Sequence, residues 1–107
     1  MTNRNLLAKL PPPSAEEDFA TLLDRPGVRI ERIVSHGHIT PPDAPYEQAQ
    51  DEWVLMVAGA ARLWLEGSDE VTLSPGDHLL IPAGVRHRVT WTPPGQPTVW
   101  LAVHIAA

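Results

Sequence analysis

The sequence predicts a single all-β domain of the sandwich or barrel type, preceded by an arm that carries a short helix. Two observations support this fold class. From residue 28 onward, short segments rich in β-branched and aromatic residues recur, and residues that favour turns separate them at short intervals. The chain has 107 residues and shows no internal repeat, which suits one hydrophobic core rather than two.

The arm is predicted to comprise residues 1–27, and the β domain residues 28–107. Ser14 and Glu17 have the spacing of a helix capping box, and they follow three consecutive prolines that would end any earlier helix. We therefore expect a helix over residues 14–24 that covers an open end or an outer face of the β domain.

Seven strands are expected in the β domain. Gly59-Ala60 and residues 67–69 have the composition of hairpin connections, and the proline-rich stretches at 41–45 and 93–97 that of stiff loops. The predicted strands cover residues 28–35, 52–58, 61–66, 71–73, 78–81, 87–92 and 98–105.

The composition excludes several classes of protein. The formal net charge is −5 and Lys and Arg form no cluster, so a surface for nucleic acid or for an anionic membrane is not expected. The chain contains no cysteine, so any metal must be held by nitrogen and oxygen ligands. We find no signal segment and no apolar run long enough to cross a bilayer, and we expect a cytoplasmic protein.

The most informative stretch is residues 76–87, GDHLLIPAGVRH. Gly76 lies in a turn where a glycine can adopt a positive φ angle. Pro82 ends the short strand that follows, because proline cannot donate a hydrogen bond to the sheet. Gly84 permits a second tight turn, which directs His87 along the next strand.

This stretch resembles the second sequence motif of the cupin superfamily, small β-barrels in which the last histidine of the motif commonly binds a metal. Nearly the whole chain resembles small single-domain cupins, which implies a cupin β-barrel, a jelly-roll-like double-stranded β-helix. The second half of the first cupin motif is present as Glu52 and Gly59 with six residues between them. The family usually has an asparagine four residues beyond the motif histidine, and here that position is Trp91, which would make the floor of the pocket more apolar.

Two alignments compete for the first half of the first motif, where the family usually has two histidines. Counting back from Glu52 by the spacing of the motif places Tyr46 and Gln48 at those positions. The resemblance then implies a reduced metal site formed by Gln48, Glu52 and His87, with Tyr46 and Trp91 as pocket residues. We favour this alignment because it preserves the strand register, and a slip of one residue would turn every side chain to the wrong face.

In the other alignment, the proline-rich loop 41–45 is an insertion. His36 and His38, which lie two residues apart on one face of a strand, would then join Glu52 and His87 around the metal. The sequence leaves both alignments open.

The resemblance implies a small cupin that binds a divalent transition metal (zinc, iron, nickel or manganese) and a small polar ligand. Two alternatives remain open. One is a metal-dependent enzyme of the isomerase, lyase or oxygenase type acting on a small organic acid or sugar, and the other is a non-catalytic ligand-binding or sensor module. If Tyr46 and Gln48 replace the histidine pair, iron-dependent oxygen chemistry is less expected, because amide ligands bind iron weakly.

Two further expectations concern tryptophan and histidine residues outside the motifs. Trp53 and Trp64 are expected to point outward on neighbouring strands and to form an apolar patch, which indicates a homodimer. His104 belongs to no motif, and we interpret it as a structural residue.

Overall fold

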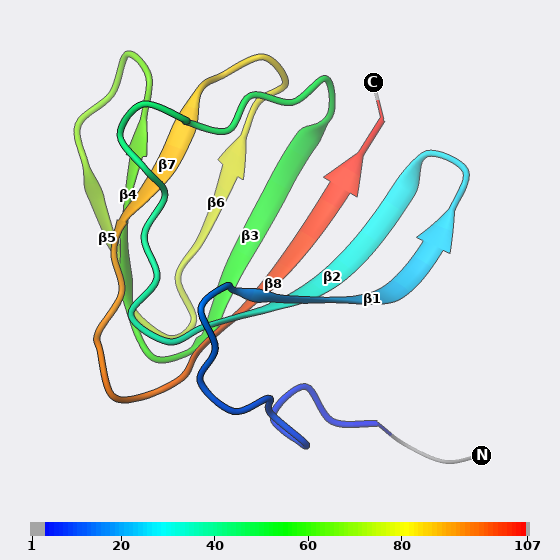
Figure 1. Ribbon diagram of the computed structural model, residues 1–107. Helices are drawn as coiled ribbons and strands as arrows, with labels where there is room; N and C mark the ends of the chain where they lie inside the picture. Colours follow the sequence, from blue (N-terminus) through cyan, green and yellow to red (C-terminus); the bar gives the residue numbers. More distant parts are fainter. Residues whose placement is uncertain (1–3, 107) are drawn as a thin grey trace.

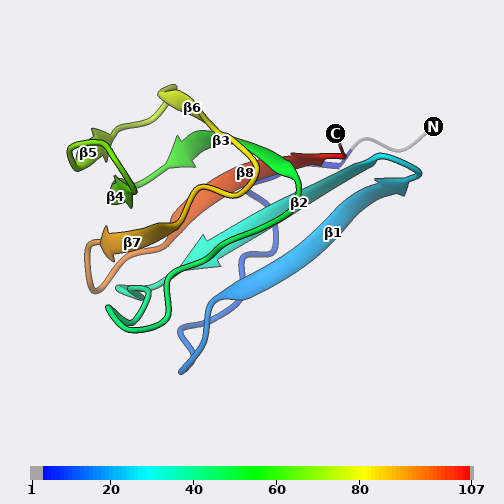
Figure 2. The ribbon, with the colours of Figure 1, turned by 90° about the horizontal axis from the view of Figure 1, so that it is seen from above.

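The computed structural model describes residues 4–106, which fold into two β-sheets (Figure 1). The larger sheet has five strands in the order β1-β2-β8-β3-β6, and the smaller has three in the order β5-β4-β7. Figure 2 shows the hairpin of β1 and β2 extending away from the smaller sheet. The strands are β1 (Asp18–Arg25), β2 (Val28–Ser35), β3 (Asp51–Ala58), β4 (Ala61–Leu65), β5 (Val71–Leu73), β6 (His78–Ile81), β7 (His87–Trp91) and β8 (Thr98–Ile105).

All seven strands predicted from the sequence are present, each within one residue of its expected bounds. The strand order could not be read from the sequence. β8, the last strand, lies between β2 and β3 and pairs antiparallel with both. This crossover brings the inward side chains of three strands that are distant in sequence onto one continuous wall.

The helix predicted over residues 14–24 is wrong. Residues 18–25 instead form β1, which pairs antiparallel with β2. The Ser14 hydroxyl accepts a hydrogen bond from the Glu16 backbone at 3.4 Å, so it makes a local turn rather than a helix cap. Pairing with the free edge of β2 supplies a ladder of hydrogen bonds that outweighs the weak local preference for helix. Within residues 4–106 there is no helix long and apolar enough to cross a membrane.

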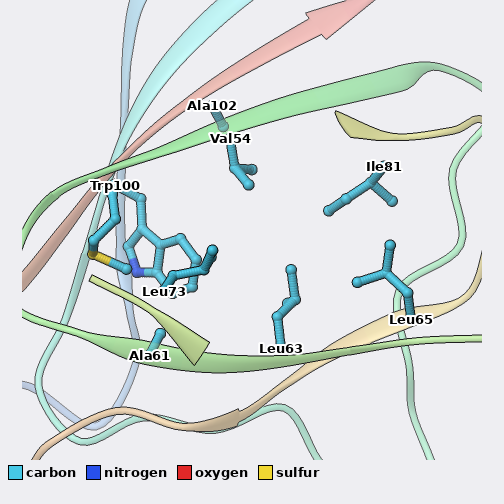
Figure 3. Close-up of a cluster of buried hydrophobic side chains, with 9 residues drawn as sticks. Val54, Ala61, Leu63, Leu65, Leu73, Ile81, Trp100 and Ala102 are labelled. Atoms are coloured by element: carbon cyan, nitrogen blue, oxygen red, sulfur yellow. The ribbon is translucent and has the colours of Figure 1, made fainter. Parts of the chain in front are cut away.

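The hydrophobic core lies between the two sheets and follows the alternation of the strands. On β3, Val54 and Met56 are buried, whereas Trp53 and Leu55 on the opposite face are partly exposed. Figure 3 shows Val54, Trp100 and Ala102 of the larger sheet facing Ala61 and Leu63 of β4. The core cluster comprises Val54, Met56, Ala61, Leu63, Leu65, Leu73, Ile81, Trp100 and Ala102.

Trp53 and Trp64 do not form the joint outward patch that we expected, because they lie on different sheets. The Trp53 ring packs against His78 with ring centroids 5.5 Å apart. The Trp64 ring is covered by Arg88, whose guanidinium carbon lies 5.7 Å from the ring centre.

Candidate functional site

An open cavity of about 270 Å³ lies between the two sheets, beside the core. Its apolar floor is formed by core residues such as Val54, Leu63, Ile81 and Trp100. The polar side chains that line it are Glu17, Arg29, Glu31, Tyr46, Gln48, Glu52, His87 and His104.

Glu52 and His87 form the centre of the polar wall. Glu52 occupies an inward position of β3 and is 8% exposed, and His87 begins β7 and is 5% exposed. The distance between His87 Nε2 and Glu52 Oε1 is 3.5 Å. His87 Nδ1 lies 3.1 Å from the Val85 carbonyl oxygen, which can only accept a hydrogen bond, so Nδ1 carries a proton. In the neutral ring, the Nε2 lone pair is therefore directed toward Glu52 and the cavity.

Backbone hydrogen bonds attach the segment around Tyr46 and Gln48 to the start of β7. The backbone groups of Tyr46 and His87 exchange two hydrogen bonds, of 2.8 and 2.9 Å, and Gly84 donates to the Gln48 carbonyl at 2.7 Å. The Tyr46 ring stacks on the His87 ring with centroids 5.7 Å apart. The Gln48 amide donates to Glu52 Oε1 at 2.5 Å. The structure thus brings Tyr46, Gln48, Glu52 and His87 together, as in the favoured alignment of the first motif.

The contacts of this cluster shift the pKa values of three groups. Burial raises the pKa of the Glu52 carboxyl, but hydrogen bonds from His87 and Gln48 and the charge of His104 outweigh it, and the net pKa is lowered. Burial lowers the pKa of His87, but its contact with Glu52 reverses the shift and the net pKa is raised. Burial and the charges of Glu17 and Glu52 raise the pKa of Tyr46, which keeps its hydroxyl protonated as a donor at neutral pH.

His36 and His38 lie outside the cavity and hold the N-terminal segment. His36 Nε2 lies 3.1 Å from the Pro11 carbonyl, and His38 Nε2 lies 2.8 Å from the Ser14 carbonyl. His38 Nδ1 accepts a hydrogen bond from the His36 backbone at 2.9 Å, so both ring nitrogens of His38 are engaged. The structure does not bring this histidine pair to Glu52 and His87.

Trp91, expected in the floor of the pocket, does not line the cavity. A β-bulge between Leu63 and Arg62 shifts the pairing of β4 with β7, so that Val89 lies opposite Leu63 and Trp91 opposite Arg62. Val89 therefore faces the cavity, and the Trp91 ring packs under the exposed Arg62, with 5.2 Å from the guanidinium carbon to the ring centre. The alternation of inward and outward side chains that we assumed along β7 therefore ends at this bulge.

Sequence reasoning missed the polar groups that β8 and β2 contribute to the same wall of the cavity as Glu52. His104, interpreted as structural, is the partner of Glu52 in one sheet pairing and of Arg29 in the next. His104 Nε2 lies 2.9 Å from Glu31 Oε1. Alternation along β2 places Arg29, Glu31 and Ile33 on one face, but only the observed strand order shows that this face lines the cavity.

The geometry of Glu52 and His87 fits a divalent metal. Ligand bonds of about 2.0–2.2 Å place two adjacent ligand atoms roughly 3 Å apart, close to the observed 3.5 Å. Rotation of the Gln48 amide would present its oxygen as a third ligand. Among residues 4–106 there is no group of three His, Cys, Asp or Glu side chains placed to hold a metal, so the third ligand must be this weaker amide or a solvent molecule.

Comparison with solved structures finds the same fold in several proteins. A crystal structure from Ralstonia eutropha JMP134, named provisionally as a mannose-6-phosphate isomerase, is 47% identical with a TM-score of 0.95 and covers 100% of both chains. A cupin superfamily protein from Desulfitobacterium hafniense is 17% identical with a TM-score of 0.80, covering 100% of this chain and 94% of the other. An RmlC-like cupin from Methanocaldococcus jannaschii is 15% identical with a TM-score of 0.70, covering 92% and 87%.

A comparison with curated proteins gives no match. A sequence profile described as a cupin domain matches residues 29–104, which include β3 with Glu52 and β7 with His87. With this match and the shared fold, the chain belongs to the cupin family.

Proposed function

We propose that this protein is a ligand-binding cupin that holds a divalent transition metal in its cavity through Glu52 and His87, with Gln48 as a third, weaker ligand. The observation that carries the proposal is the convergence of His87 Nε2 and Glu52 Oε1 at 3.5 Å on the cavity wall. The hydrogen bond between His87 Nδ1 and Val85 supports it, because it fixes the tautomer that a metal requires.

A bound divalent ion would act as a Lewis acid on an oxygen of the ligand. The surrounding residues would orient that ligand. Tyr46 offers a protonated hydroxyl in the cavity lining, and in the metal-free protein the Gln48 amide holds the carboxylate of Glu52 by a hydrogen bond. The core side chains beneath exclude water from the inner end of the cavity.

Metal content tests the proposal directly. Untagged protein is purified and dialysed with each candidate metal. It should then retain up to one metal ion per chain, as measured by elemental mass spectrometry. Glu52→Ala and His87→Ala should each weaken metal binding by about tenfold or more, and Gln48→Ala by less. His78→Ala is the matched control, since His78 is exposed and lies outside the cavity.

A double His36→Ala, His38→Ala variant separates the two alignments of the first motif. It should bind metal as the wild type does, because both side chains contact the N-terminal segment and not the cavity. Absence of metal binding in wild-type protein, or equal binding in His87→Ala, would contradict the proposed site.

An isomerase is the second candidate function. It is favoured by the 47% identity to the protein named provisionally as a mannose-6-phosphate isomerase, and by a carboxylate and an imidazole 3.5 Å apart that could relay a proton. A phosphorylated substrate fits the cavity poorly. Among the described residues that line the cavity, Arg29 is the only Lys or Arg, and three carboxylates line it as well. Interconversion of an unphosphorylated sugar or small acid, lost in His87→Ala, would establish this activity.

We also propose that the protein forms a homodimer through the outer face of its larger sheet. One row of neighbouring residues across β6, β3, β8 and β2 consists of Leu80, Trp53, Val103 and Ile30, all of which are apolar and at least partly exposed. A sheet that is apolar on both faces requires a cover. A second copy related by a twofold axis would place this row against itself.

A further inference from the structure

Arg29 lies at the end of a row of inward-facing residues that crosses three strands. Glu52 on β3 is paired with His104 on β8, and His104 is paired with Arg29 on β2. Neighbouring strands lie about 4.8 Å apart, so the row spans roughly 10 Å from the Glu52 backbone to that of Arg29. The cavity thus has two polar ends, one at Glu52 and His87 and the other at Arg29.

The guanidinium group of Arg29 is incompletely paired. Its Nε atom is buried and has no hydrogen-bond partner. The nearest carboxylate oxygen, Oε2 of Glu31, is 3.7 Å from Nε, too far for a hydrogen bond. The other oxygen of Glu31 is engaged by His104 at 2.9 Å. The side chain as a whole is 39% exposed and lines the cavity, so its terminal N–H groups, which are permanently charged donors, can bind an acceptor on a ligand there.

The three carboxylates that line the cavity already have partners. Glu31 contacts His104, Glu52 contacts Gln48 and His87, and Glu17 accepts a hydrogen bond from the Ser35 hydroxyl. Their charges still oppose a doubly charged anion in the cavity. A single negative charge matches the single guanidinium, and the planar arginine fork fits the two oxygens of a carboxylate.

The remainder of the cavity between the two polar ends is apolar. Ile33, next to Glu31 on the inward face of β2, and Trp100 and Val54 line it. At about 270 Å³, the cavity is at or below the small end of the ~300–1,000 Å³ range of ligand pockets. The ligand therefore has a small apolar body.

We propose that the cavity binds a small monocarboxylic acid with an apolar body, whose carboxylate rests on the guanidinium group of Arg29. The inference rests on the proposed function in that the same cavity is the ligand site, but it does not require the metal. Glu31, which contacts His104, lies beside the guanidinium group at 3.7 Å from Nε.

Titration calorimetry with matched probes tests this inference. Phenylacetate and isocaproate each have a neutral amide counterpart of the same shape, phenylacetamide and isocaproamide. The acids should bind the wild type at least about tenfold more tightly than the amides. Arg29→Gln should remove this preference and leave amide binding unchanged, and Arg29→Lys should restore part of it. Arg25→Gln, at the exposed end of β1, should behave as wild type.

Equal binding of acid and amide by the wild type would overturn the inference, and so would acid binding unaffected by Arg29→Gln. Absence of saturable binding of either acid up to about 10 mM would overturn it as well. The wild-type comparison is decisive even if Arg29→Gln fails to fold. Repeating the titrations with chelator and with added metal separates the two proposals. If metal-free protein prefers the acid to the amide and this preference depends on Arg29, the inference holds even where no metal binds. If the protein binds metal but shows no such preference, the inference is refuted and the metal site still stands.

Discussion

Gly59 occupies the turn between β3 and β4, where the chain leaves one sheet and enters the other. Its φ angle is +88°, and a Cβ atom added there would lie 2.7 Å from Thr98 Oγ1 and 2.9 Å from the Thr98 Cα. Gly67 has nearly the same φ angle, +80°, but an added Cβ would meet nothing within 4 Å. The two glycines therefore separate the cost of backbone conformation from the cost of a steric clash.

Gly67→Ala should lower the free energy of unfolding by roughly 1–2 kcal/mol, the cost of a left-handed conformation in a non-glycine residue. Gly59→Ala should carry the same cost and, in addition, about 1–3 kcal/mol for overpacking against backbone that cannot move aside. For a domain of this size, each kcal/mol lowers the melting temperature by about 4–8 °C.

Urea unfolding and thermal melts of both variants measure the difference. Gly59→Ala should unfold at least about 4 °C below Gly67→Ala. Because β3 carries Glu52 and β4 carries Leu63, displacement of this turn should also alter the width of the cavity. Equal destabilisation of the two variants would refute the argument that close approach of Thr98, rather than the φ angle alone, requires glycine at position 59.

Two further predictions concern the Glu52–His87 pair and the larger sheet. Folding lowers the pKa of Glu52 from 4.5 and raises that of His87 from 6.5. The pair should therefore stabilise the metal-free protein most between pH 4.5 and 6.5. This stabilisation should be lost as the pH falls through the folded pKa of Glu52, and also as the pH rises through the folded pKa of His87. In urea unfolding from pH 5 to 8, the free energy of unfolding should fall at high pH in the wild type but not in His87→Ala. If His87→Ala shows the same dependence on pH as the wild type, the assignment to His87 is contradicted. Trp53→Glu and Leu80→Glu should each lower the molecular mass measured by light scattering from that of a dimer to that of the 11.7 kDa monomer. Thr72→Glu, at an exposed position of the smaller sheet, should leave the mass unchanged. A wild-type protein with the mass of a monomer would exclude the dimer.

The strands of the β domain were predictable because each is a β-rich segment bounded by glycine or proline. β1 was missed for a physical reason. The segment around Ser14 and Glu17 satisfies a local helix rule, but the free edge of β2 offers more hydrogen bonds than an isolated helix of that length would gain. That edge exists only once β2 is placed beside β8, and no property of residues 14–24 reveals it.

The candidate site was predictable where the chain itself brings residues together. Gln48, Glu52 and His87 follow from motif spacing, and the bonds between residues 46–48 and the start of β7 place them in one cavity. Arg29 and His104 were not predictable, because they become neighbours of Glu52 only through the crossover of β8 between β2 and β3. The position of Trp91 depends on a single extra residue in β7, which no sequence periodicity signals.

Two residues at the start of β1 and just before it contribute to the lining of the cavity. Glu17 and Phe19 line the cavity, and the segment before them is held by bonds from His36 and His38 to the Pro11 and Ser14 carbonyls. Neither residue belongs to the core cluster between the sheets, so substitutions at these two positions can alter which ligands enter while that cluster is kept. Changes at Glu17 and Phe19 can therefore alter ligand choice separately from the packing between the sheets.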